Sequence, residues 1–144
     1  MKNVISFLCM LLFFTFNSCS QDRVITFDQL PANSQTTITK YFNKDNISFV
    51  KIDEEAFSYE YEIYFNDGTK VEFEKSGEVK KVECNHQRVP DGLIPAPVLT
   101  YVKNNYPNAF IIEWNKKRNG WKAELNNELE LYFNNQYQFI GIDD

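Results

Sequence analysis

The sequence predicts an α+β fold of two tandem repeats, each a short helix followed by about four antiparallel strands, with the helices on one face of the sheet. Three observations lead to this prediction. The chain can be aligned with itself, each copy opens with a proline suited to the first turn of a helix, and apolar residues then alternate with polar ones.

The internal repeat has two parts. LPANSQTTITKYFNKDNISFV, which begins at Leu30, aligns with IPAPVLTYVKNNYPNAFIIEW, which begins at Ile94. Further on, YEIYFNDGTKVEFEKSGEVKKV from Tyr61 aligns with WKAELNNELELYFNNQYQFIGI from Trp121. The change in spacing falls in the loop around residues 53–58, where a length difference has a small entropic cost. Since about sixty residues make a marginal core, the two copies are expected to share a sheet or to pack side by side.

A helix is expected after Pro31 in the first copy and after Pro95 in the second, because proline lacks only an N–H that would have no partner there. The second helix is expected to end before Pro107, since a proline disfavours helix at the residue before it. The apolar stripes are formed by Ile38, Tyr41 and Phe42 in the first helix and by Val98, Leu99, Val102 and Tyr106 in the second.

Strands are expected after each helix. Residues 57–65 and 69–74 alternate between apolar and polar side chains, the pattern of strands with one buried and one solvated face. Asn66-Asp67-Gly68 fits the hairpin turn between them, because Asp-Gly tolerates the positive φ of such turns. Ser76-Gly77 turns the chain into another strand, and Asn126-Asn127 occupies the hairpin turn of the second copy.

The first residues predict export. Met1-Lys2-Asn3 carries one positive charge and precedes an apolar stretch, Val4–Phe16, that has the length of a signal-peptide core and is too short to span a bilayer. Ser18 is small and Cys19 follows it directly, an order that resembles a bacterial lipoprotein signal. We expect lipidation of Cys19 and an extracytoplasmic protein held at the membrane by its lipid alone, in the periplasm or on the cell surface; simple secretion is the alternative.

The expected organisation follows from these boundaries. It comprises a signal peptide at residues 1–18, an N-terminal tether at 19–29, a first repeat at 30–84, a linker at 85–93 and a second repeat at 94–144.

Charge and cysteine content argue against a nucleic-acid-binding protein and against a fold held by disulfides. The chain has 15 basic and 20 acidic residues, and loss of Lys2 with the leader leaves 14 and 20, a formal charge of −6 that disfavours nucleic acid as a partner. Cys84 is then the one cysteine that is neither removed nor acylated, so no internal disulfide is expected. We interpret Cys84 as a half-buried residue at a strand end rather than a reactive thiol, and His86 as a loop residue.

No catalytic residue, cofactor or metal site is expected. The sequence contains no Gly-x-Ser-x-Gly, no His-Glu-x-x-His and no paired cysteines, and no loop has the ligand spacing of an EF-hand. The glutamates of the strands alternate with core residues and accompany lysines, which is typical of a solvated sheet face with cross-strand ion pairs.

The order of these features resembles the PepSY-like family of bacterial extracytoplasmic proteins, also described as β-lactamase-inhibitor-like. The resemblance rests on Leu30-Pro31, the helix that ends at Tyr41-Phe42, YEIYFNDGTKVEFEKSGEVKKVEC, and Val89-Pro90 before Ile94-Pro95, and it spans about Ile25 to Ile142. It implies the tandem α/β fold of a protein inhibitor of β-lactamase and an extracytoplasmic location. It implies no reaction, and fold analogy alone is a weak basis for assigning inhibition.

Two functions are compatible with these features. The first is a binding module that holds a protein or peptide of the cell envelope on the sheet face opposite the helices, where tyrosines among charged residues would anchor the partner. The second is a structural envelope lipoprotein with no soluble ligand. The candidate partner-binding residues are Glu62, Tyr64, Glu72, Lys122, Glu124 and Tyr132.

Overall fold

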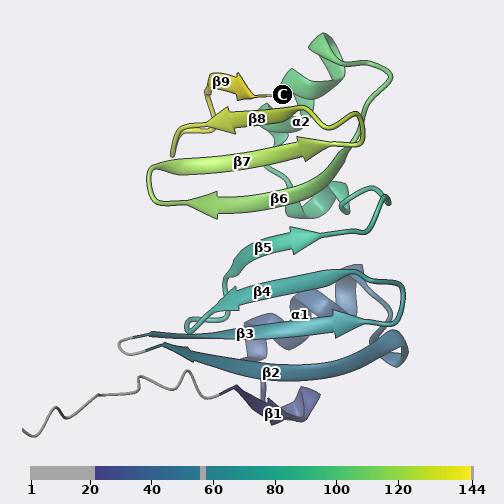
Figure 1. Cartoon of the computed structure of the whole chain (residues 1–144), viewed down its shortest axis with the longest axis vertical. Coiled ribbons are helices and arrows are strands. Elements are labelled where there is room, and N and C mark those ends of the chain that lie inside the picture. The colour runs from purple at the N-terminus through teal and green to yellow at the C-terminus, as the bar shows by residue number, and fades with distance from the viewer. Residues whose placement is uncertain (1–21, 56–57, 144) are drawn as a thin grey trace, which may run out of the picture.

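The strands of this protein form one continuous antiparallel sheet. The computed structural model describes residues 22–55 and 58–143, which fold into nine strands and two α-helices (Figure 1). The strand order in the sheet is the order in the sequence, from β1 at one edge to β9 at the other. The elements are β1 (Arg23–Ile25), η1 (Phe27–Gln29), α1 (Ala32–Tyr41), η2 (Lys44–Asn46), β2 (Ile47–Glu55), β3 (Ser58–Phe65), β4 (Lys70–Glu74), β5 (Val79–Glu83), η3 (Asp91–Leu93), α2 (Ala96–Asn105), β6 (Ile111–Lys117), β7 (Gly120–Leu125), β8 (Glu130–Phe133) and β9 (Phe139–Asp143).

The predicted fold class is wrong. The molecule is a single nine-stranded sheet with little helix, not two tandem repeats of a helix and four strands. The physical reason is the pairing of β5 with β6, in which Val82 lies opposite Trp114, so that the hydrogen-bonded ladder continues across the expected boundary. Beyond β5, the Cys84 N–H donates to the Ile112 carbonyl at 2.8 Å. A further strand, β1, lies within the segment expected to be a tether and pairs with β2.

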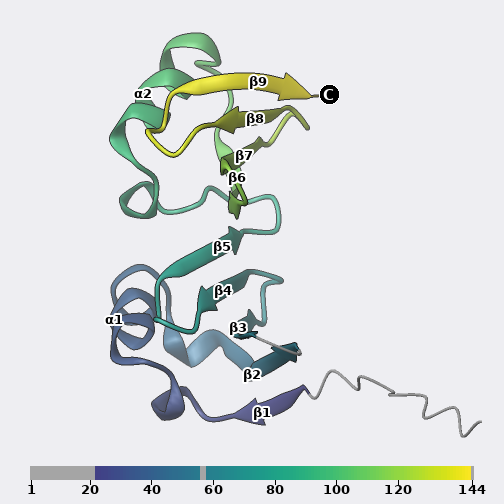
Figure 2. The same cartoon turned by 90° about the vertical axis from the view of Figure 1, so that its left-hand side faces the viewer.

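Both helices lie on the same side of the sheet. Figure 2 shows α1 beside the N-terminal strands and α2 beside the C-terminal strands, with no described helix on the opposite side. Each helix follows a proline as expected, Pro31 before α1 and Pro95 before α2. The backbone N–H of Tyr106 donates to the Val102 carbonyl at 2.7 Å and closes the last turn of α2 one residue before Pro107.

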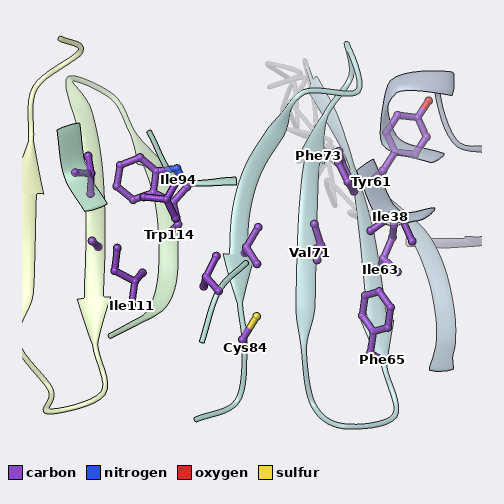
Figure 3. Close-up of a cluster of buried hydrophobic side chains, with 14 of the residues drawn as sticks. Ile38, Tyr61, Ile63, Phe65, Val71, Phe73, Cys84, Ile94, Ile111 and Trp114 are labelled. Atoms are coloured by element: carbon purple, nitrogen blue, oxygen red, sulfur yellow. The ribbon is translucent and has the colours of Figure 1, made fainter. Parts of the chain in front are cut away.

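The core fills the space between the helices and the sheet. Ile38 of α1 and Val98 of α2 are completely buried against inward-facing residues of the strands. Figure 3 shows how Ile63, Val71 and Trp114 from β3, β4 and β6 contribute to this layer. Full burial of one such large apolar side chain contributes about 1.5–3 kcal/mol. The buried residues form one cluster that extends along the sheet under both helices, so the core is shared as the sheet is.

The expected turn between β3 and β4 is confirmed. Gly68 has a φ of +86°, and the Thr69 N–H donates to Asp67 Oδ1 at 2.9 Å. The turn between β7 and β8 contains Asn126-Asn127 as expected, but its positive φ of 71° falls on Glu128.

The expected signal peptide and the candidate lipidation site, Cys19, lie outside the described residues. Across residues 22–55 and 58–143, every helix is too short or too polar to cross a membrane.

Candidate functional site

The side of the sheet opposite the helices carries an ordered array of charged side chains, here called the open face. Its residues alternate along each strand with the core residues, as Glu62 does between Tyr61 and Ile63. Strand register aligns many of them into cross-strand rows, and two of these rows cross most of the sheet. One row runs Lys51, Glu62, Glu72, Lys81, Asn115, Lys122 and Tyr132, and the other runs Tyr64, Lys70, Glu83, Glu113, Glu124 and Glu130.

At the N-terminal end of the open face, a buried carboxylate is surrounded by donors. Glu62 is only 6% exposed. Its carboxylate pairs with Lys70 Nζ at 2.8 Å and Lys51 Nζ at 2.9 Å, and it accepts a hydrogen bond from Tyr64 Oη at 2.8 Å. Burial alone would raise the pKa of Glu62, but the bonds from Lys70, Lys51 and Tyr64 together hold it below its ordinary value.

The same contacts also offset the repulsion between two glutamates that lie opposite each other on neighbouring strands. Glu62 and Glu72 lie directly opposite each other on β3 and β4, where two like charges destabilise a sheet. Lys70 Nζ bridges them, because it lies 2.8 Å from Glu62 and 2.7 Å from Glu72. We call Lys51, Glu62, Tyr64, Lys70 and Glu72 the Glu62 cluster.

At the C-terminal end of the open face, the buried charged group is a lysine instead of a glutamate. Lys122 is 8% exposed, and its Nζ lies 2.6 Å from Glu130, 3.2 Å from Glu113 and 3.2 Å from Glu124. Burial lowers the pKa of Lys122, but the bonds and charges of the three glutamates outweigh it and hold the pKa above its ordinary value. Tyr132 Oη donates to Glu130 at 2.6 Å. These residues form the Lys122 cluster: Glu113, Lys122, Glu124, Glu130 and Tyr132.

Four carboxylates lie directly opposite one another across β5, β6, β7 and β8. This glutamate row consists of Glu83, Glu113, Glu124 and Glu130. Lys122 bridges the last three, and Lys81 Nζ pairs with Glu83 at 2.7 Å and with Glu113 at 3.2 Å. Within these ion pairs, two lysines thus face four glutamates, an excess of two negative charges. The Glu62 cluster has two lysines and two glutamates and is balanced.

The six sequence-predicted residues fall into these two clusters. Glu62, Tyr64 and Glu72 lie in one, and Lys122, Glu124 and Tyr132 lie in the other. Because Glu62 and Lys122 are buried, they position their neighbours rather than offer their own surface. Direct partner contact by any of the six stays a prediction.

Several members of the open face were not predicted from the sequence: Lys51, Lys81, Glu83 and Glu113. Their strands lack the long alternation of apolar and polar residues that marks β3 and β4. The signal that could have identified them is that each is next to an apolar residue that packs inward.

The carboxylates of the open face form ion pairs and are not prepared as general acids. Burial with no partner raises the pKa of a carboxylate and can prepare it as a general acid, but the pKa of each of Glu62, Glu113 and Glu130 is lowered by its partners. Within the described chain, no group of three or more histidine, cysteine, aspartate or glutamate side chains is placed to hold a metal ion.

Cys84 lies at the end of β5 and is buried, so the expected half-burial at a strand end understates how far the thiol is enclosed. Burial raises its pKa to about 11, although a hydrogen bond with Thr69 opposes that rise. A thiol with such a pKa is almost wholly protonated at neutral pH and is a poor nucleophile.

The fold and the sequence both have relatives. The family described as "Putative beta-lactamase-inhibitor-like, PepSY-like" matches residues 59–141, from β3 to β9. No curated protein matches the sequence.

Three solved structures, all from Bacteroides, are similar over nearly their whole length. One, from Bacteroides vulgatus, is described as a "putative periplasmic protein" of the DUF2874 family; it is 30% identical, with a TM-score of 0.83 over 88% of this chain and 99% of that one. A Bacteroides thetaiotaomicron protein described as a "putative calcium-regulated periplasmic protein" is 33% identical, with a TM-score of 0.81 over 85% and 97%. Another Bacteroides vulgatus protein, a "putative periplasmic protein of unknown function", is 28% identical, with a TM-score of 0.80 over 86% and 100%.

The family match takes in nearly all of both clusters, and two of these relatives are at least 30% identical over most of the chain. The protein belongs to the PepSY-like, β-lactamase-inhibitor-like family.

Proposed function

We propose that this protein is a non-enzymatic, lipid-anchored binding module of the bacterial cell envelope that holds a basic protein or peptide on its open face. The observation that carries the proposal is the glutamate row, in which four carboxylates lie side by side on a sheet face that no described helix covers. A surface with this excess of negative charge attracts basic partners and speeds their encounter at low salt.

The face is organised before any partner arrives. Lys122 fixes three glutamates in place, while the side chains of Glu124 and Glu130 remain about a third exposed at 31% and 30% and that of Glu83 is 49% exposed. A preorganised surface loses less side-chain entropy on binding. Each cluster contains one tyrosine, Tyr64 or Tyr132, and aromatic side chains of this type often dominate binding energy.

An extracytoplasmic location is supported by the relatives, each of which is described as periplasmic, and by the family itself. The anchor is proposed at Cys19 from the sequence order alone. Cys19→Ala should move the processed protein from the membrane fraction to the soluble fraction. A processed variant that sediments with membranes as the wild type does would remove the anchor from the proposal.

One relative is described as calcium-regulated, but the open face of this protein does not favour a calcium ion. The carboxylates of the Lys122 cluster are engaged by a lysine, which occupies the place that a cation would need.

An alternative is a structural envelope lipoprotein with no soluble ligand. The observation that favours it is the internal pairing of the open face, because the described residues leave no buried side-chain nitrogen or oxygen without a hydrogen-bond partner. Such a face is stable in water with nothing bound to it.

Affinity measurements with a captured partner separate the two functions. A partner isolated from the cell envelope with the wild-type protein is purified and its affinity is measured for Tyr64→Ala/Tyr132→Ala and for Glu124→Gln/Glu130→Gln. Each variant is first checked for folding by its melting curve. Truncation of an anchor aromatic is expected to cost about 2 kcal/mol or more.

Asn104→Ala, on the exposed surface of α2, is the matched control and should bind as the wild type does. Full affinity in both open-face variants would place the partner elsewhere, and the absence of any specific partner would favour the structural role.

A further inference from the structure

A hollow of about 290 Å³ lies on the helix side of the molecule, away from the open face. Its walls come from the segment before η3, from α2 and from the residues that lead into β6. This volume lies near the lower end of small-molecule sites, which measure about 300–1,000 Å³. The hollow is therefore of a size for a small organic molecule rather than for a folded segment.

Most of the residues that line the hollow are apolar. α2 contributes Leu99 and Val102, which lie three residues apart and so share one face of the helix. Phe110, just before β6, is part of the same lining. Such a lining favours the alkyl or aryl body of a ligand.

The rim of the hollow is cationic. The guanidinium of Arg88 lies 5.2 Å from the centre of the Phe110 ring, a cation–π contact that holds it at the mouth. Its ion pair with Asp91 is long, at 3.8 Å, and both side chains are more than half exposed, so the pair is weak. Lys103, one residue after Val102, lines the same hollow and has no ion pair with the described part of the chain.

This charge distribution contrasts with that of the two clusters on the open face. Two cations and one carboxylate leave the rim with one positive charge in a chain of net charge −5. On the open face, each of the lysines of the two clusters is bridged to glutamates. The guanidinium of Arg88, by comparison, has its donors available for a bidentate bond with an incoming carboxylate.

We propose that this hollow binds a small molecule with an apolar body and a single carboxylate, such as a medium-chain fatty acid. The carboxylate accepts hydrogen bonds from Arg88 and pairs with Lys103, and the apolar body packs on Leu99, Val102 and Phe110. This site is independent of the open face and of the partner proposed for it.

The test uses the full chain with Cys19→Ala, purified without detergent so that no amphiphile competes. Octanoate is the probe, and octan-1-ol, with the same body and no charge, is the comparison. Isothermal titration calorimetry at neutral pH should show saturable binding of one octanoate, and octan-1-ol should bind about tenfold or more weakly, since the charged hydrogen bonds are lost.

The variant Arg88→Gln/Lys103→Gln removes both rim cations from exposed positions and should weaken octanoate binding by about tenfold or more, with octan-1-ol unaffected. Lys44→Gln/Arg118→Gln makes the same change of charge at exposed positions away from the hollow and should bind octanoate as the parent does. Amide chemical shifts should move in α2 and around Phe110 when octanoate is added.

Three results would overturn the proposal: no saturable octanoate binding, equal loss of affinity in the two double variants, or chemical-shift changes confined to the open face. The affinity for octan-1-ol distinguishes a lost rim contact from a misfolded hollow, because misfolding would weaken both ligands.

Discussion

At the scale of single residues, the most informative side chains are Glu62 and Lys122. Each is a buried charge on a solvent-facing side of a sheet, and each is surrounded by groups of opposite charge. Removing water from a charge is unfavourable unless partners replace it, so these two residues are stable only as the centres of their clusters.

The carboxylates of the open face predict how stability depends on pH. The pKa values of Glu62, Glu113 and Glu130 are lower in the folded protein than the ordinary value of 4.5. A group whose pKa is lowered by folding contributes stability that is complete above the unfolded-state value and is lost as the pH falls through the folded-state value. We therefore expect the free energy of unfolding to decrease below about pH 4.5, measured by urea denaturation at several pH values.

In Glu62→Gln/Glu113→Gln the decrease should be shallower, because two of these groups no longer titrate. An identical pH dependence in the variant and the wild type would show that the clusters do not stabilise the fold.

Replacement of Lys122, the central residue of its cluster, should lower the free energy of unfolding. Lys122→Met leaves three glutamates close together with their shared cation gone, and loss of one partner from a buried ion pair destabilises a protein by about 3 kcal/mol or more. Lys80→Met is the matched control, because Lys80 is one-third exposed and its one ion pair within residues 22–55 and 58–143 is with Glu60, an interaction of roughly 0–1 kcal/mol. Equal losses of unfolding free energy in the two variants would contradict the account.

At the scale of elements, the turns and strands differ in how far they could be predicted. The β3–β4 hairpin could be predicted because Asp67-Gly68 is a sequence that favours hairpin turns. The β7–β8 turn has its positive φ at Glu128, and glutamate is not a residue type that indicates such a turn. β1 has only three residues, too few for alternation to be recognised.

The candidate site could be predicted in part for the same reason. Alternation along β3 and β4 indicates that Glu62 and Glu72 share a face, but it carries no information on which strand lies beside which. The glutamate row depends on the register between β5 and β6, and on Glu113, which follows a bulge that interrupts the alternation of β6.

The first residue of β7, directly after the turn from β6, has a stringent requirement for glycine. Gly120 has a φ of +151°, and a Cβ added there would lie 2.0 Å from the carbonyl oxygen of Phe133. Gly120→Ala should therefore lower the free energy of unfolding by about 2 kcal/mol or more, measured by chemical denaturation. Gly141→Ala, where no atom lies within 4 Å of the added Cβ, should change it little, and a similar cost at both positions would contradict this explanation.

At the scale of the whole molecule, the main structural fact is the continuity of the sheet. An internal repeat in the sequence suggests two units, but pairing of β5 with β6 and a shared core merge them into one. Sequence periodicity reports which face of a strand is buried, and not whether distant strands are hydrogen-bonded to each other. The number of units could therefore not be obtained from the pattern alone.

Cooperative unfolding should follow from this continuity. Separation of the chain into residues 22–85 and 91–144 would expose Val82 on one fragment and Trp114 on the other, and each fragment would retain too little core to fold. The intact protein should unfold in one calorimetric transition, and each fragment should show none. Two sharp and independent transitions from the separate fragments would contradict a single folding unit.

Binding of a basic partner to the open face of β5–β8 can be measured by a titration followed by nuclear magnetic resonance. The probe is a short peptide of alternating lysine and threonine, added to the isotope-labelled full chain with Cys19→Ala at low ionic strength. We expect saturable shifts for the amides around Glu83, Glu113, Glu124 and Glu130, with an affinity that decreases as salt is added. Shifts confined to α1 and α2, or no saturable shift at low salt, would contradict this expectation.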